Sequence, residues 1–359
     1  MPESKKLFQC GGLNFFSGVR RGLSYNSIIE DARVLSADYL PNKMVHRDSE
    51  RQAIAENLKP ILEGEQPIDM LLHGPPGTGK TAMANYVVEE LENHASNLEY
   101  GSVQCFRNPS RFEAYYQLVR DMGEFVTRDG TATEELLDII EEKARKRPMV
   151  VIIDELDQLK DESFLYDISR LNTVGKIMIS NTETVFGRLD QRIQSSFSTR
   201  EDIRFESYSE KELTDILLDR RKHGLKPETV SRKQLERIAE RSNGDARVAI
   251  GTLRLAARKA EREGLEEITD SIIEESFSDA VEKDKSLSLN RLNSHQRILY
   301  NVIKKEGDVA PGDLYEEYRS KAEEPKNKRT LRRYLNKMQD FGLIEAKGEK
   351  RGRRYSIAE

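Results

Sequence analysis

The chain has 359 residues, of which 37% are hydrophobic and 34% are charged, and its formal net charge is −5. This length is enough for two or three domains, and apolar residues recur at helical spacing, which excludes a disordered chain. The longest apolar run, residues 149–153, is far too short to cross a bilayer. The two cysteines, Cys10 and Cys105, lie far apart and predict neither a disulfide framework nor a metal site, so we expect a cytoplasmic protein.

Residues 1–27 are predicted to form an N-terminal tail. The stretch KKLFQCGGLNFFSGV faintly resembles a signal peptide, but Gln9, Asn14 and glycines interrupt its apolar part. No small-residue cleavage pattern follows, which favours a tail over a processed signal.

A glycine-rich loop follows a predicted buried strand that ends at Leu71 and Leu72, in the stretch LLHGPPGTGKTAMANYVVEEL. Gly74, Gly79, Lys80 and Thr81 match G-x-x-x-x-G-K-[ST], and an amphipathic helix comes next. Inward-facing amides at the helix N-terminus bind phosphates, Lys80 reaches the β- and γ-phosphates, and the Thr81 hydroxyl binds Mg²⁺. The alternative is a glycine-rich turn that matches by chance.

Residues 106–123, FRNPSRFEAYYQLVRDMG, predict an amphipathic helix. Phe112, Tyr115, Tyr116 and Leu118 recur at the spacing of a face that packs on a core.

The stretch PMVVIIDELDQL predicts a strand buried on both faces of a parallel sheet, with Asp154 at its carboxyl end. Asp154 is expected to hold Mg²⁺ through water, and Glu155 to polarise the attacking water. An acidic pair after a strand is otherwise often a helix N-terminal acid. Asp157 is interpreted as a solvated or capping acid.

A further apolar strand, GKIMISNTETV, ends in polar residues that include Asn181. If this strand neighbours the Asp154 strand, Asn181 lies beside the γ-phosphate; a turn-forming asparagine is the alternative. After it, Arg188 and Arg192 are interpreted as surface charges, DNA contacts or a finger that reaches into a neighbour's ATP site.

The stretch SNGDARVAIG predicts a turn and then a helix capped by Asp245. Arg247 falls in the first turn, where the helix dipole disfavours a cation. This misfit suggests an anion outside the helix, which we interpret as the ATP phosphates; a plain surface arginine is the alternative.

The chain ends in a basic region. Residues 326–354 contain eleven Lys or Arg against three Asp or Glu, a local net of +8 that leaves −13 for the remainder. From Ser294 the pattern predicts three helices and a hairpin, a winged helix-turn-helix in outline. The third helix places Leu331, Tyr334, Leu335 and Met338 on one face. The predicted DNA-binding residues are Lys328, Arg329, Arg332, Arg333 and Lys337 on the helix and Lys350, Arg351, Arg353 and Arg354 on the wing.

The motifs GPPGTGKT, VVIIDELD, ISN and GDAR, in this order, resemble those of the AAA+ ATPases. The stretches VLSADYLPNKMVHRDSERQAIAENLKPILEGEQPIDMLLHGPPGTGKT and YSEKELTDILLDR resemble archaeal origin-recognition (ORC-type) replication initiators, and the resemblance covers most of residues 28–359. It implies an α/β fold: a P-loop AAA+ parallel sheet with a helical lid and a winged helix. The domains expected are the tail at 1–27, the AAA+ base at 28–206, the lid at 207–285 and the winged helix at 286–359.

The resemblance also implies residue roles. Asn181 is the first sensor, Arg247 the second, and Arg192 the candidate arginine finger. The chain departs here from related ATPases that place the finger in a Ser-Arg-Cys motif, because QSSF has no arginine. Ser209 and Glu212 form a capping box. Arg107 and Arg111 of the 106–123 segment are possible minor-groove contacts. The residues implied around ATP or ADP are Val45, His46, Arg47, Gly74, Pro75, Pro76, Gly77, Thr78, Gly79, Lys80, Thr81, Tyr208, Arg220 and Arg247.

The function expected is an ATP-switched replication initiator that hydrolyses ATP slowly, associates with the nucleoid and binds double-stranded origin DNA. Its expected partners are an MCM-type replicative helicase and neighbouring copies of itself on DNA. The alternatives are a transcription regulator with the same DNA-binding end, a remodelling motor or clamp-loader-like enzyme, and an initiator paralogue that serves a plasmid or virus.

Overall fold

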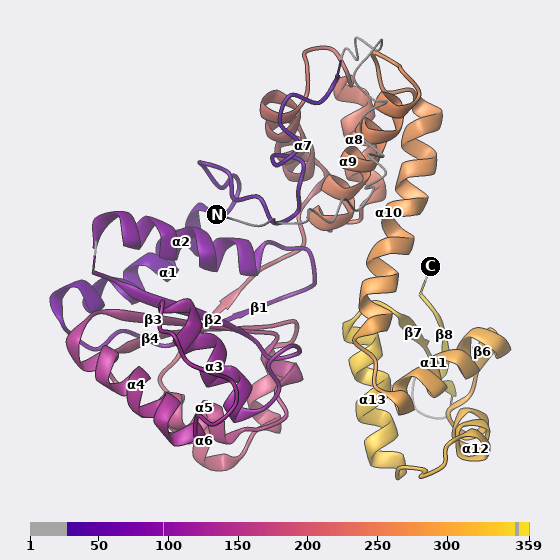
Figure 1. The fold of residues 1–359 in the computed structure, drawn as a ribbon. Helices are drawn as coiled ribbons and strands as arrows, with labels where there is room; N and C mark the ends of the chain where they lie inside the picture. Colours follow the sequence, from indigo (N-terminus) through magenta and orange to yellow (C-terminus); the bar gives the residue numbers. More distant parts are fainter. Residues whose placement is uncertain (1–26, 96, 349–351, 359) are drawn as a thin grey trace, which may run out of the picture.

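The structure is a computed structural model that describes residues 27–95, 97–348 and 352–358. Its first body is built on a sheet that lies between helices (Figure 1). The sheet has five strands in the order β2-β3-β4-β1-β5, and every pairing in it is parallel. The strands are β1 (Met70–His73), β2 (Glu99–Gln104), β3 (Met149–Asp154), β4 (Val174–Ser180) and β5 (Glu201–Arg204).

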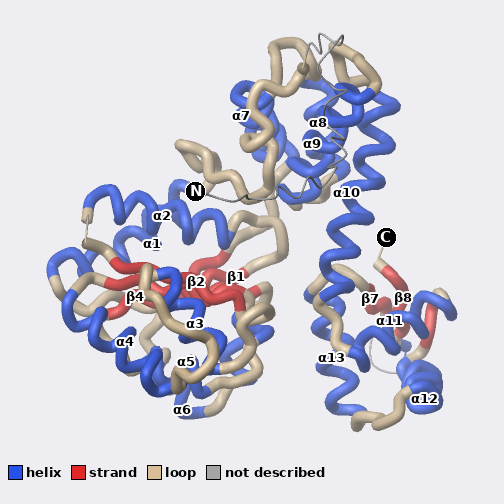
Figure 2. The backbone as a smooth tube through the Cα atoms, in the orientation of Figure 1, coloured by secondary structure: helices blue, strands red, loops and turns tan. Residues whose placement is uncertain are grey.

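Helices cover both faces of this sheet (Figure 2). On one face lie α1 (Asp48–Leu58) and α2 (Lys80–His94), and on the other α3 (Arg111–Asp121), α4 (Thr133–Lys146), α5 (Ser163–Ser169) and α6 (Gln191–Ser196). Strand β3 sends Val151 and Ile153 into one core and Val150 and Ile152 into the other. The prediction of a strand buried on both faces is therefore confirmed. The short helices η1 (Lys59–Glu63), η2 (Leu156–Gln158) and η3 (Glu183–Arg188) connect these elements.

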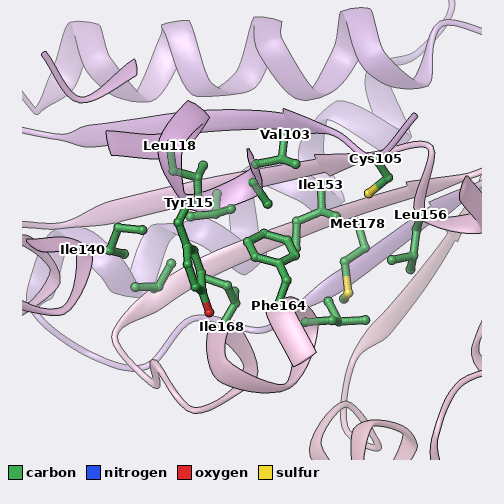
Figure 3. Packing of buried hydrophobic residues seen from close by; sticks show 14 of the residues in the cluster. Val103, Cys105, Tyr115, Leu118, Ile140, Ile153, Leu156, Phe164, Ile168 and Met178 are labelled. Carbon is green, nitrogen blue, oxygen red and sulfur yellow. The ribbon is translucent and has the colours of Figure 1, made fainter. Parts of the chain in front are cut away.

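The core beneath the sheet is built around aromatic side chains (Figure 3). The Tyr115 and Phe164 rings pack at a centroid distance of 5.4 Å, and the Tyr115 hydroxyl donates to an Asp167 oxygen at 2.6 Å. The 106–123 segment thus contains a core-facing helix, α3, as its periodicity predicts.

A helical lid follows the sheet, formed by α7 (Glu210–Gly224), α8 (Arg232–Arg241), α9 (Ala246–Arg262) and the first part of α10 (Asp270–Asn290). The predicted capping box of Ser209 and Glu212 begins α7, and Asp245 caps α9 through the amides of Arg247 and Val248. Ile28 and Leu35, from the start of the predicted base domain, pack in the core of this lid.

The long helix α10 continues from the lid into the C-terminal body (Figure 1). That body consists of α11 (Ser294–Glu306), β6 (Asp308–Val309), α12 (Pro311–Lys321), α13 (Lys328–Asp340), β7 (Ile344–Lys347) and β8 (Arg354–Ile357). Its antiparallel sheet has the order β6-β8-β7. This is the element order of a winged helix-turn-helix. Helix α12 ends at Lys321, and the next residue, Ala322, is extended and buried in the core.

Within the described residues, no helix is both long enough and apolar enough to cross a membrane.

Candidate nucleotide site

A cavity of about 620 Å³ lies at the carboxyl ends of β3 and β4, where open α/β sheets bind their ligands. Three parts of the chain line it. The sheet domain contributes the P-loop and the ends of β3 and β4; the lid contributes Tyr208, Arg220 and Arg247; the last turn of α10 and the end of α13 contribute Ser288, Arg291 and Phe341.

The P-loop is shaped by glycines in the left-handed region. Gly79 has φ 90° and stands at the N-cap of α2, so the first amides of that helix face the loop. Gly77 has φ 73°, and a side chain there would collide with the Asp245 carboxylate. The Gly77 carbonyl also accepts from the Ala246 amide at 3.0 Å. The loop is therefore held against the N-terminus of lid helix α9.

Lys80 lies buried beneath the loop. Its Nζ donates to the carbonyls of Gly74 and Pro75, each at 2.7 Å. Burial lowers the pKa of Lys80 to about 8, and the nearby Asp154 carboxylate opposes that shift. An added phosphate would stabilise the charged form of the amine, so the site favours an anion.

Thr81 and Asp154 meet across the site. The Thr81 hydroxyl donates to an Asp154 oxygen at 2.9 Å, and the other Asp154 oxygen accepts from the Glu155 amide at 2.8 Å. Burial raises the pKa of Asp154 and these hydrogen bonds counter it. A hydroxyl and one carboxylate are the oxygen donors that Mg²⁺ takes beside nucleotide phosphates, so these two residues fit the ion. Among the described residues, no cluster of three or more His, Cys, Asp or Glu could hold a metal.

Glu155 takes φ 54°, an uncommon value for a residue other than glycine, directly after β3. Its carboxylate lies 2.8 Å from the Arg291 guanidinium, which comes from the end of α10. Burial raises the pKa of Glu155, and Arg291 opposes the shift. Arg291 could not be predicted from sequence, because it belongs to no motif and follows Glu155 by more than a hundred residues.

The two sensor candidates both line the cavity. Asn181 directly follows β4, which pairs with β3, so the predicted strand neighbourhood is confirmed. Arg247 pairs with its own capping residue Asp245 at 2.8 Å and with Asp284 of α10 at 3.5 Å. Its unfavourable place at a helix N-terminus is thus offset by carboxylates within the lid.

The candidates Val45, His46 and Arg47, expected around the nucleotide, fall into two groups. Val45 lines the cavity, whereas His46 bonds Asp215 of α7 at 3.0 Å. Arg47 is buried, stacks on the Tyr208 ring at 4.1 Å and donates to the Glu206 carbonyl. His46 therefore connects the base domain to α7 of the lid, and Arg47 connects it to the segment between β5 and α7.

Arg220 lines the cavity and also holds part of its wall. It donates to the carbonyls of Val34 at 2.8 Å and Tyr39 at 3.0 Å. The Tyr39 segment forms one side of the cavity, a wall that no sequence motif predicted. Of the P-loop candidates, residues 76–81 line the cavity, and Gly74 and Pro75 instead accept from Lys80.

Arg192 lies outside the cavity on α6. Its side chain is 78% exposed, pairs with Asp190 at 3.1 Å and stacks over the Tyr166 ring. In the 106–123 segment, Arg111 is paired internally with Asp167 at 2.7 Å and Glu134 at 2.9 Å, while Arg107 is exposed.

The predicted DNA-binding residues fall into groups. Arg353 is exposed directly before β8, the second strand of the wing. Four further exposed residues lie on α13, namely Lys328, Arg329, Arg332 and Arg333. Arg354 pairs with Asp308 at 2.6 Å. Lys350 and Arg351 lie outside the described residues.

Lys337, on the same helix, is half-buried on the side of the ATPase sheet. Burial lowers its pKa, and the Asp157 carboxylate after β3 opposes that shift. Asp157 is likewise half-buried, with one oxygen lacking a hydrogen-bond partner. Of the two expectations, a solvated or a capping acid, it is therefore not the freely solvated one, and it lies in the first turn of η2.

One cavity brings together a P-loop before α2, an acidic pair after β3, a polar residue after the neighbouring strand β4, and an arginine from the lid. Together these features define an AAA+ ATPase. A family model described as an AAA domain matches residues 69–183, and one described as a Cdc6 AAA+ ATPase-type lid domain matches residues 214–278. The chain is 40% identical over 337 residues to ORC1-type DNA replication protein 9 of Halobacterium salinarum, covering 93% of this chain and 95% of the relative. The chain therefore belongs to the family of ORC1-type DNA replication proteins.

Two solved structures share the fold. The Aeropyrum pernix ORC1 protein in complex with DNA aligns with a TM-score of 0.72 at 24% identity, over 92% of this chain and 94% of that chain. The Aeropyrum pernix ORC2 protein in its ADPNP–ADP complexes aligns with a TM-score of 0.65 at 20% identity, over the same shares.

Proposed function

We propose that this protein is an ATP-switched DNA replication initiator, which binds origin DNA and helps to recruit the replicative helicase. The observation that carries the DNA-binding part is the α13 face of Lys328, Arg329, Arg332 and Arg333, on a chain of this family. Among the described residues, no carboxylate pairs with these four side chains. A basic helix face that is not neutralised within the protein, on an otherwise acidic chain, suits a polyanion.

The winged helix would place α13 in the major groove, where Arg332 and its neighbours reach base edges. Arg353, at the wing, would contact the phosphate backbone. The acidic remainder of the chain would disfavour wider coating of DNA. Arg107, exposed beside the sheet, is a second proposed contact, whereas the internal ion pairs of Arg111 disfavour it as one.

The cavity would hold ATP or ADP between base and lid. Lys80 and the α2 amides would bind the phosphates, and Thr81 and Asp154 would hold Mg²⁺, which neutralises phosphate charge. Glu155 would accept the proton of the attacking water, Asn181 would orient that water, and Arg247 would contact the γ-phosphate from the lid. Because the lid is part of the site, the bound nucleotide would set the angle between base and lid.

Arg192 is the proposed finger for a neighbouring copy. Its side chain is exposed on α6 and stands outside its own cavity, as a residue acting in a neighbour's site must. Copies bound side by side on origin repeats would form such sites, and the assembled copies would present a surface for the helicase.

Genome-wide crosslinking of the protein to DNA in its own cells, with sequencing of the bound fragments, tests the initiator role. We expect a few sharp peaks where marker-frequency profiles show replication starting. Peaks confined to promoters would instead establish a transcription regulator that uses the same ATP switch.

Two arginine substitutions test the DNA interface. Arg332→Ala should weaken binding to the cognate site about tenfold or more and relax base preference, because a side chain on a base edge contributes ~1–3 kcal/mol. Arg353→Ala should weaken binding to all sequences alike and reduce the slope of log affinity against log salt by about 0.9. Titrations of cognate and scrambled duplexes at several salt concentrations separate the two effects.

Lys233→Ala is the matched control, since it removes one exposed positive charge from the lid, away from α13. Unchanged affinity in both arginine variants would refute the assignment of α13 and the wing as the DNA-binding surface.

A further inference from the structure

Arg291, at the junction of α10 and the winged-helix body, forms an ion pair inside the nucleotide site. Its guanidinium lies 2.8 Å from the Glu155 carboxylate, and the pair is half-buried, with the two side chains 31% and 18% exposed. Arg291 also lines the cavity that contains Lys80, Thr81 and Asp154. The ion pair therefore joins Glu155, the candidate base, to the end of α10, outside the P-loop domain.

Arg291 moves with the winged-helix body. It is the C-cap of α10, and the next residue, Leu292, is buried in the core of the C-terminal body, as is the neighbouring Tyr300. Leu289, one turn earlier, packs against that core too. A rotation of the winged helix relative to the sheet domain would therefore carry the Arg291 side chain with it.

A second part of the winged-helix body, the end of α13, also lies at the cavity. Phe341, after the end of α13, lines the cavity and is buried. Lys337 and Asp340 of α13 lie within electrostatic reach of Asp157 and Arg188 respectively. The exposed face of Arg329, Arg332 and Arg333 belongs to this same helix. One helix thus carries both the proposed DNA surface and a contact with the ATPase.

We propose that Arg291 withholds Glu155 from the attacking water, so that the position of the winged helix controls ATP hydrolysis. While the Arg291 guanidinium occupies the Glu155 carboxylate, that carboxylate is not free to contact the attacking water. Displacement of the winged helix, as when DNA engages α13, removes Arg291 and frees Glu155. The inference rests on the proposed role of Glu155 as the base.

The test uses the full chain with two readouts, single-turnover ATP hydrolysis and the distance between the two bodies. Distance is followed by energy transfer between dyes placed by Glu56→Cys on α1 and Ser320→Cys on α12, in a Cys10→Ser background; Cys105 is buried. Both readouts are taken for Arg291→Ala, Arg291→Lys and Glu155→Gln. Arg297→Ala on α11 is the matched control, because it removes an exposed arginine from the same body.

We expect Arg291→Ala to hydrolyse ATP roughly fivefold faster, the effect of losing one partly exposed ion pair. The same variant should broaden the distance distribution, Arg291→Lys should partly restore both readouts, and Arg297→Ala should match the unchanged protein. In a Glu155→Gln background, Arg291→Ala should change the distance distribution no further, because its partner charge is already gone.

Slower hydrolysis in Arg291→Ala with unchanged distances would overturn the proposal and make Arg291 a phosphate ligand of its own site. An unchanged rate with broadened distances would also overturn it, leaving the pair a structural clasp. Failure of the base assignment is distinguishable from both: Glu155→Gln would then hydrolyse normally while the distance response of Arg291→Ala persisted.

Discussion

Lys80→Ala should reduce the affinity for ATP by about a hundredfold or more, because it removes charge-assisted hydrogen bonds to the phosphates. The loss should exceed that of any exposed lysine, because the Lys80 amine is buried beneath the loop, where its charge is weakly screened. Equilibrium binding of a fluorescent ATP analogue to the full chain measures it.

The control is Lys59→Ala, which removes an exposed charge from the same domain. Thermal unfolding checks that both variants fold; the Lys80 variant loses donors to the Gly74 and Pro75 carbonyls but keeps the glycine geometry of the loop. Near-normal ATP affinity in a folded Lys80→Ala protein would contradict the phosphate site described above.

Glu155→Gln should bind ATP with nearly unchanged affinity and hydrolyse it about a hundredfold more slowly or worse, since a positioned general base contributes roughly 10²–10⁴ in rate. Glutamine keeps the size of the side chain and removes its capacity to take a proton. Single-turnover hydrolysis of labelled ATP and equilibrium binding, measured on the same preparation, separate chemistry from affinity.

Glu183→Gln serves as control, because this carboxylate is exposed on η3, close to the same sheet edge but outside the cavity. Its rate should match that of the unchanged protein. If Glu155→Gln hydrolysed ATP at the normal rate, another residue would be the base, and the ion pair with Arg291 would have no catalytic consequence.

Much of the ATPase framework could be predicted because its signals are local. A glycine pattern and a following amphipathic helix specify the P-loop around Lys80, since the backbone conformations and helix dipole act over a few residues. Residues 149–153 of β3 are apolar at every position, as expected for a strand that is covered on both faces. The caps Ser209 and Asp245 likewise mark helix starts with side chains that bond their own next turn.

The roles of His46 and Arg47 were less predictable because they depend on partners far away in the sequence. His46 and Arg47 are adjacent in sequence to Val45, yet they bind Asp215 and the Glu206 carbonyl instead of lining the cavity. Arg111 was a candidate DNA contact until its position against Asp167 was known. A charged side chain has the same sequence signature whether its partner is a ligand, a carboxylate or water.

The sequence by itself determined the P-loop, the Asp154 strand, the lid cap and the basic C-terminal helix, because each depends on residues close together in the chain. Only the tertiary structure decided which parts share the cavity. The pairing of Glu155 with Arg291 joins residues far apart in sequence, and neither residue's neighbours indicate it. The contact depends on how α10 positions the winged-helix body relative to the sheet. No short sequence pattern encodes that packing.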